Sequence, residues 1–215
     1  MFKLKNFSLS YGTKLILDDI NLSIAAGEKI ALVGRSGVGK STLLNALAKQ
    51  HSHAVAYCVQ DRELITGLSS YNNIYLGKLA QFSVWQNLTN LIVPNKTALA
   101  QISAITEQLQ IDELLHQSIN KLSGGQQQRV AVARAFFQQR AAFLGDEPVS
   151  NLDSAKAHQV IAAILERHAT CVVALHDKSL ALQYFDRIIG LKERKIVLDA
   201  NATQVSASDL AELYW

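Results

Sequence analysis

The chain has 215 residues, of which 49% are hydrophobic and 18% are charged, enough for one domain with a sizeable core. Its formal net charge of +3 comes from Lys and Arg interspersed with acidic residues, which argues against a nucleic-acid-binding protein. No window holds the roughly 18 uninterrupted apolar residues of a membrane span, and Cys58 and Cys171 form no CxxC pair. We therefore expect a cytoplasmic protein with buried, reduced thiols that reaches a membrane only through a partner.

Short apolar segments alternate with helical periodicity along the chain. The first predicted strands have no helix between them, which predicts an antiparallel β layer, and the later order is typical of a largely parallel α/β sheet. We expect strands at 2–9, 20–24, 28–33, 54–59, 141–145, 170–175, 187–191 and 195–199. We expect helices at 40–50, 97–109, 124–138, 154–167 and 178–184. No linker divides residues 1–215, so we expect a single domain with a helix-rich insertion at about 63–120.

The segment GRSGVGKST, residues 34–42, follows an apolar strand and opens the first predicted helix. It satisfies G-x-x-x-x-G-K-[ST], the Walker A loop, whose backbone N–H groups surround the phosphates of ATP or GTP. We expect Lys40 to reach the β and γ phosphates, Ser41 to ligate Mg²⁺ and Thr42 to lie near a phosphate. The candidate phosphate-binding residues are Gly34, Arg35, Ser36, Gly37, Val38, Gly39, Lys40, Ser41 and Thr42.

A later apolar strand ends in Asp146 and Glu147, and we expect a neighbouring strand of the sheet to present both acids beside these phosphates. Asp146 would complete the Mg²⁺ shell, and Glu147 would act as the general base on the attacking water. His176 closes the strand TCVVALH and offers a donor and an acceptor to the γ phosphate and the water. Alone, such an acid pair is often a solvated turn and such a histidine is more often structural, so both roles depend on the phosphate loop.

The string LSGGQQQR, residues 122–129, resembles the signature of ATP-binding cassette (ABC) proteins, and the other motifs occur in that family's order. The resemblance covers nearly the whole chain. It implies a P-loop NTPase core of the RecA-like type, with a reduced N-terminal antiparallel β subdomain and an inserted α-helical subdomain. It also implies that Tyr11 stacks on adenine, that Gln60 senses Mg²⁺ and the γ phosphate, and that Asp153 contacts a partner chain.

Ser123, Gly124, Gly125 and Gln126 open a predicted helix, and the first N–H groups of a helix form a site for a phosphate. One chain cannot use this site and its own Walker A loop on the same phosphate, so a second chain is implied. The resemblance implies a head-to-tail homodimer that holds each ATP between the Walker A loop of one chain and the signature of the other.

The segment after Gln60 resembles that of phosphonate-importer ATPases, at Gly77, Leu79, Ser83, Trp85 and Leu88. This implies an ATPase subunit at the cytoplasmic side of the inner membrane that powers uptake of phosphonate or a related small anion. Its partners would be integral membrane permease subunits and, indirectly, a solute-binding protein. Two alternatives stay open, a non-transport ABC ATPase that is regulatory or associated with nucleic acid or ribosomes, and an accessory cassette with weak catalysis. Core packing in a helical subdomain would also explain Trp85.

Only twenty positions separate Lys40 from Gln60, where relatives carry a longer stretch that forms antiparallel strands. The missing stretch supplies no phosphate ligand, so we expect ATP hydrolysis to survive while the antiparallel β layer is reduced. The joint presence of Lys40, Ser123, Glu147 and His176 argues against a loss of catalysis.

Overall fold

The computed structural model describes residues 1–59 and 63–214, and the strands in these ranges form two sheets. The larger sheet has the order β4-β5-β6-β3-β7-β8, parallel except for β8, and the smaller is the antiparallel pair β1-β2. The strands are β1 Phe2–Tyr11, β2 Lys14–Ile24, β3 Lys29–Val33, β4 Val55–Cys58, β5 Ala142–Asp146, β6 Thr170–Ala174, β7 Arg187–Lys192 and β8 Lys195–Asn201. The predicted α/β class with a small antiparallel layer is confirmed.

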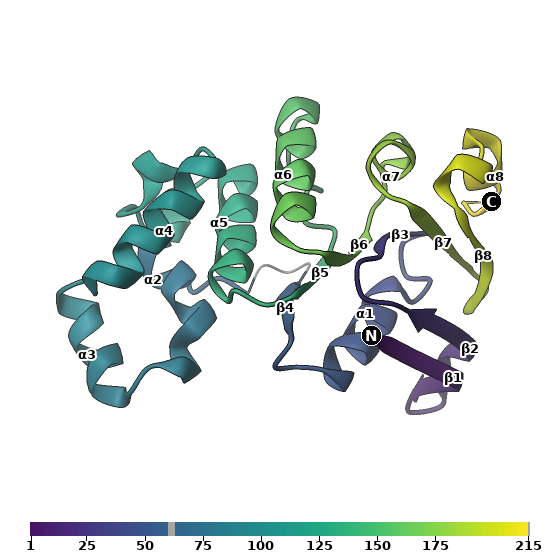
Figure 1. Cartoon of the computed structure of the whole chain (residues 1–215), viewed down its shortest axis with the longest axis horizontal. Coiled ribbons are helices and arrows are strands. Elements are labelled where there is room, and N and C mark those ends of the chain that lie inside the picture. Colours follow the sequence, from purple (N-terminus) through teal and green to yellow (C-terminus); the bar gives the residue numbers. More distant parts are fainter. Residues whose placement is uncertain (60–62, 215) are drawn as a thin grey trace.

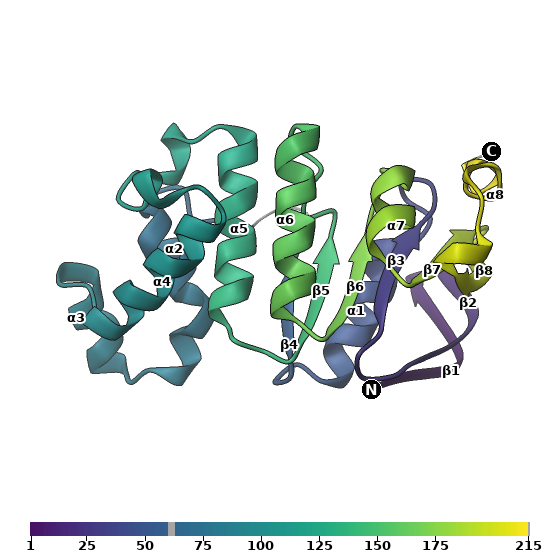
Figure 2. The same ribbon diagram turned by 45° about the horizontal axis from the view of Figure 1, so that its top comes forward.

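Helices cover both faces of the larger sheet, with α1 on one face and α5, α6 and α7 on the other (Figures 1 and 2). Helices α2 to α4 lie together at one end of the molecule, and β1-β2 lies at the other (Figure 1). The α-helices are α1 Lys40–Gln50, α2 Ser70–Tyr75, α3 Val84–Ile92, α4 Lys96–Gln108, α5 Gly124–Phe137, α6 Ser154–Arg167, α7 Lys178–Tyr184 and α8 Ala207–Glu212. Short 3-10 turns are at Leu76–Gln81, Asp112–Leu114, Ile119–Lys121 and Ala202–Gln204.

The central strands are buried on both faces because successive side chains point to opposite sides of a sheet. In β3, Ile30 and Leu32 pack in a cluster with α1 and the β1-β2 pair, whereas Ala31 and Val33 pack in the cluster of α5, α6 and α7. This double burial explains why these strands are apolar throughout. It also fixes the loops at their carboxyl ends, where the candidate site lies.

The antiparallel pair is longer than expected, because β2 begins at Lys14 and not at residue 20. The two strands are joined by a tight turn at Gly12, whose φ is 59°. Exposed residues alternate irregularly with buried ones along β1, and register shifts interrupt the pairing, so the sequence pattern is weak there.

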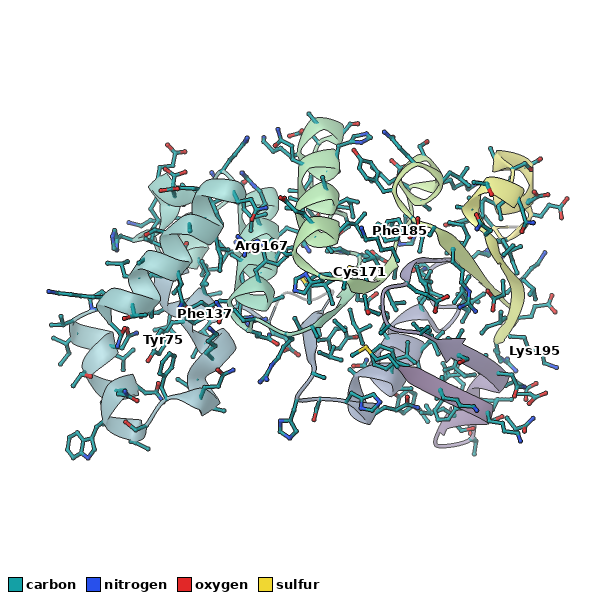
Figure 3. All side chains as sticks on the ribbon, in the orientation of Figure 1. Tyr75, Phe137, Arg167, Cys171, Phe185 and Lys195 are labelled. Carbon is teal, nitrogen blue, oxygen red and sulfur yellow. The ribbon has the colours of Figure 1, made fainter. Side chains whose placement is uncertain are left out.

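The predicted helix-rich insertion contains α2, α3 and α4, of which only α4 was predicted as a helix. Tyr75 of α2 lies beside Phe137 of α5 with ring centroids 6.3 Å apart, where the segment joins the core (Figure 3). The packing explanation for Trp85 is wrong, because this side chain is 78% exposed on α3.

Both cysteine side chains are buried and form no disulfide, as expected. Burial raises the thiol pKa of each to about 12. Within the described ranges, no helix combines the length and apolar character required to cross a bilayer.

Candidate functional site

The loop between β3 and α1 has the conformation expected of a phosphate-binding loop. Gly34, Gly37 and Gly39 have φ angles of 145°, 76° and 116°, a region that residues with a side chain rarely adopt. A Cβ atom on Gly34 would also lie only 2.4 Å from the carbonyl oxygen of Leu191, at the end of β7. The loop therefore requires glycine both for its curvature and for its close approach to the sheet.

Lys40, the first residue of α1, directs its ammonium into this loop. Its Nζ donates hydrogen bonds to the carbonyl oxygens of Gly34 at 2.8 Å and Arg35 at 3.1 Å, and the side chain is buried. Burial lowers the pKa of Lys40, while the charges of Glu147 and Asp146 act in the opposite direction. The structure thus brings the Walker A lysine close to both acids that follow β5.

The start of α1 presents backbone donors. The first N–H groups of a helix have no partner within it. The N-cap residue here is Gly39, which has no side chain that could accept a hydrogen bond from them. The first turn holds no acidic residue, and Ser41 and Thr42 are half-buried there. With the helix dipole, this end of α1 favours an anion.

The expected adjacency of the acid-bearing strand is wrong, because β6 lies between β3 and β5. Asp146 and Glu147 still reach the loop, since the carboxyl ends of parallel strands meet at one edge of a sheet. Both are buried, with exposed fractions of 3% and 8%. Glu147 has a φ of 53°, and its N–H donates to the carbonyl oxygen of Ala174 in β6 at 3.2 Å. A non-glycine residue in this conformation is strained, which is common at active sites.

His176 contacts Glu147 directly. Its Nε2 lies 2.5 Å from Glu147 Oε1, and the imidazole is 43% exposed while the carboxylate side chain is 10% exposed. Beside this pair is a cavity of about 250 Å³, lined also by Ser150, Leu175 and Asp177. The glutamate thus lines a solvent-accessible cavity.

The signature begins α5 in a capping box. Ser123 Oγ accepts a hydrogen bond from the Gln126 N–H at 3.3 Å, and Gln126 Oε1 accepts one from the Ser123 N–H at 2.8 Å. Gly125 packs closely on the next loop, since a Cβ there would lie 2.8 Å from the carbonyl oxygen of Asn151. Asp153 caps α6 by accepting from the Lys156 N–H at 3.0 Å.

The predicted site residues therefore fall into two groups. The Walker A residues, Asp146, Glu147 and His176 meet at the carboxyl edge of the sheet, whereas Ser123 to Gln126 lie with Asp153 at the starts of α5 and α6. Tyr11, at the end of β1, is 63% exposed. Gln60 lies outside the described residues.

Gln128, the third glutamine of LSGGQQQR, is not among the predicted site residues. It is fully buried in α5, and its Nε2 donates to the carbonyl oxygen of Glu147 at 3.4 Å. The sequence signal for this contact between the signature helix and the strained glutamate was only the place of the glutamine inside the motif.

Comparisons with known proteins agree with this geometry. The family model described as ABC transporter matches residues 17–150. A phosphonates import ATP-binding protein of Halalkalibacterium halodurans is 36% identical over 245 residues, covering 100% of this chain and 94% of that protein. Because this chain has only 215 residues, the relative is longer within the match.

Two solved structures have the same fold. A dimeric bacterial ABC transporter cassette superposes with a TM-score of 0.82 at 26% identity, covering 94% of this chain and 99% of that one. A dimeric cassette in a post-hydrolysis state, bound to ADP and phosphate, gives a TM-score of 0.76 at 26% identity, with the same coverage.

Proposed function

This chain belongs to the ABC transporter family and is an ATPase subunit of that class, and we propose that it hydrolyses ATP as a head-to-tail homodimer to power anion import. The cargo we propose is a phosphonate or a related small anion, because a relative that matches the full chain is a phosphonates import ATP-binding protein.

In this proposal the Walker A loop binds the ATP phosphates. The N–H groups at the start of α1 and the Lys40 ammonium supply positive potential at one place, and the glycine φ angles let the loop wrap around an anion. Tyr11 is exposed at the end of β1 and is available to stack on adenine.

The donor set fits Mg²⁺, which prefers hard oxygen ligands and keeps several waters. Ser41 offers a hydroxyl at the start of α1, Asp146 offers a buried carboxylate at the end of β5, and Gln60 is the third ligand that we propose. Bound there with ATP, Mg²⁺ would neutralise phosphate charge and polarise the γ phosphate.

Glu147 is the general base in this proposal. Its carboxylate is held by His176 at 2.5 Å, and its backbone is fixed through Ala174 and Gln128. A base must be held within reach of the water whose proton it takes, and this geometry restrains Glu147 in the wall of a cavity. His176 would contact the γ phosphate and the same water.

The dimer follows from the separate position of the signature. Gly124 and Gly125 place N–H groups at the start of α5, and the Ser123 hydroxyl keeps a proton to donate, so this end of the helix suits a phosphate. Because Gly125, at the start of α5, packs on Asn151 and Leu152 in the loop before α6, away from its own Walker A loop, we propose that it closes the ATP of a second chain. Dimeric related cassettes support this arrangement.

The partner surface that we propose is the apolar groove between α2 and α3. It encloses about 250 Å³ and is lined by Leu68, Tyr75, Leu79, Leu88 and Leu91, among others. Trp85 and Ile92 add exposed apolar area on α3, at 78% and 86%. Such a patch marks a protein interface. We propose that integral membrane permease subunits cover it, which places this chain at the cytoplasmic face of the inner membrane with a solute-binding protein as an indirect partner.

The observation that carries the proposal is the Glu147–His176 contact beside the buried Lys40. Steady-state phosphate release from ATP tests it. Glu147→Gln should lower the rate by about 10²–10⁴-fold, the usual contribution of a positioned general base. The control is Glu166→Gln, at an exposed acid in the last turn of α6, the end opposite Asp153, which should retain the wild-type rate. Equal rates in the two variants would contradict the proposed chemistry.

A further inference from the structure

Tyr214 contacts both sides of the proposed ATPase site, although it belongs to no motif described above. It follows α8, a segment that is anchored at several points. Leu210 and Leu213 are buried, Lys192 Nζ donates to the carbonyl oxygen of Glu212 at 3.0 Å, and Leu213 packs so closely on β7 that a Cβ on Gly190 would lie 2.7 Å from its Cδ1. The backbone that carries Tyr214 is therefore held firmly beside the sheet.

The ring of Tyr214 lies under the first residue of α7. Lys178 Nζ is 4.6 Å from the ring centroid, within the range of a cation–π interaction. Lys178 follows His176 by only two positions, and α7 has seven residues, too few to be stable without tertiary contacts. The ring thus restrains the start of α7 and, through it, the loop that carries His176.

The hydroxyl of Tyr214 points towards the other side of the site. Burial raises the pKa of Tyr214 most strongly, the charge of Glu147 raises it further, and the backbone N–H of Gly34 is close enough to lower it. Among the described residues this buried hydroxyl still makes no hydrogen bond of normal geometry. Because the hydroxyl has no such partner, the observed contact with α7 is made by the aromatic ring.

We propose that Tyr214 is a positioning residue for ATP hydrolysis, which holds the start of α7 and thereby His176 at a fixed distance from Gly34 and the Walker A loop. The proposal rests on the proposed function, because it assumes that His176 and the Walker A loop act on the same ATP. The aromatic ring carries the restraint on Lys178, so phenylalanine should replace tyrosine better than an aliphatic residue does.

The test compares Tyr214→Leu, Tyr214→Phe and Lys178→Gln in steady-state ATP hydrolysis of the full chain. Loss of one cation–π contact should lower kcat about five-fold in Tyr214→Leu and Lys178→Gln, with the KM for ATP within about two-fold. Tyr214→Phe should restore kcat to within about two-fold of wild type. The double variant Tyr214→Leu/Lys178→Gln should be no slower than either single variant, because the two residues act through one contact.

The matched control is Tyr184→Leu, at the last residue of α7. It removes an aromatic ring and a hydroxyl that contacts His158 of α6. It should leave kcat unchanged. Thermal unfolding of every variant shows which temperature keeps all of them folded during the assay. The His176 imidazole signal in ¹H–¹³C NMR spectra should move in Tyr214→Leu and return in Tyr214→Phe.

Three results would overturn the proposal: a wild-type kcat in Tyr214→Leu, an equal loss in Tyr214→Phe, or a fall in kcat with an unmoved His176 signal. Failure of the proposed function is distinguishable, since wild-type protein would then show no hydrolysis that depends on Glu147. The His176 signal would still report whether Tyr214 positions this side chain.

Discussion

The molecule contains two glycine-rich helix starts that differ in how their first turn is satisfied. Helix α1 begins after Gly39, whose backbone is in a left-handed conformation. Gly39 has no side chain that could accept a hydrogen bond from the first turn of the helix. Helix α5 begins after Ser123 with a complete capping box. Both ends favour anions, but only the first is surrounded by a loop of its own chain.

The difference indicates that the two starts do different work. At α1, in our proposal, the curled loop and the Lys40 ammonium form a phosphate site within one chain. At α5, the capping box stabilises the helix without a ligand and uses the N–H groups of Ser123 and Gln126, so in our proposal those of Gly124 and Gly125 bind the incoming phosphate. Variants at the α1 start should therefore impair ATP binding, whereas variants at the α5 start should impair only steps that need two chains.

The largest difference is expected between two glycine variants. Gly34→Ala combines a φ of 145° with a Cβ that would lie 2.4 Å from a backbone oxygen, and should lower the free energy of unfolding by about 3 kcal/mol or more. Gly125→Ala meets the Asn151 oxygen at 2.8 Å in a helical conformation, and should cost about 1–3 kcal/mol. Urea unfolding without nucleotide measures both.

The control for these variants is Gly67→Ala, because a Cβ on Gly67 meets no atom within 4 Å. It should change the free energy of unfolding by no more than about 0.5 kcal/mol. If Gly34→Ala proved as mild as this control, the strained geometry described for the Walker A loop would be wrong.

The next effect is on ATP affinity. Lys40→Met removes a buried charge that faces the phosphates in our account, and should weaken ATP binding by about 10–100-fold. Lys49→Met, in the last turn of the same helix, is the matched control. Ser123→Arg should keep the affinity of the single chain for ATP. Titration calorimetry with ATP measures all three, and an equal loss in Lys40→Met and Ser123→Arg would remove the distinction between the two helix starts.

The smallest effect separates capping from function at α5. Ser123→Ala should lower the free energy of unfolding by about 1 kcal/mol, the usual cost of a lost N-cap, and should also slow ATP hydrolysis. Ser83→Ala removes the same Ser–Gln capping box from α3 and should cost a similar stability without slowing hydrolysis. Hydrolysis slowed equally in both variants would show that Ser123 acts only as a cap.

The sequence was sufficient to predict the central strands and the Walker A loop, for identifiable physical reasons. Strands buried on both faces are apolar throughout, and the spacing of glycines with Lys40 permits few loop conformations. The sequence does not encode strand order in any local pattern, so the insertion of β6 between β3 and β5 could not be read from it.

Other features depend on tertiary contacts. The short α3 was not predicted as a helix although its apolar residues recur at helical spacing, and only the structure shows that this apolar face is largely exposed. Gln128 and Tyr214 are notable only for contacts with residues distant in sequence. Gln128 contacts Glu147, and Tyr214 contacts Lys178 and lies near Gly34. No periodicity or motif spacing reports such contacts.

The measurement that tests the central claim most directly is the mass of Glu147→Gln in solution with and without ATP, by light scattering after size exclusion. We predict a monomer near the chain mass of 23.6 kDa without ATP and a species of twice that mass with ATP, because the bound γ phosphate joins two chains that cannot hydrolyse it. Adding Ser123→Arg to this variant should abolish the dimer. A Glu147→Gln chain that binds ATP and remains a monomer would contradict the account.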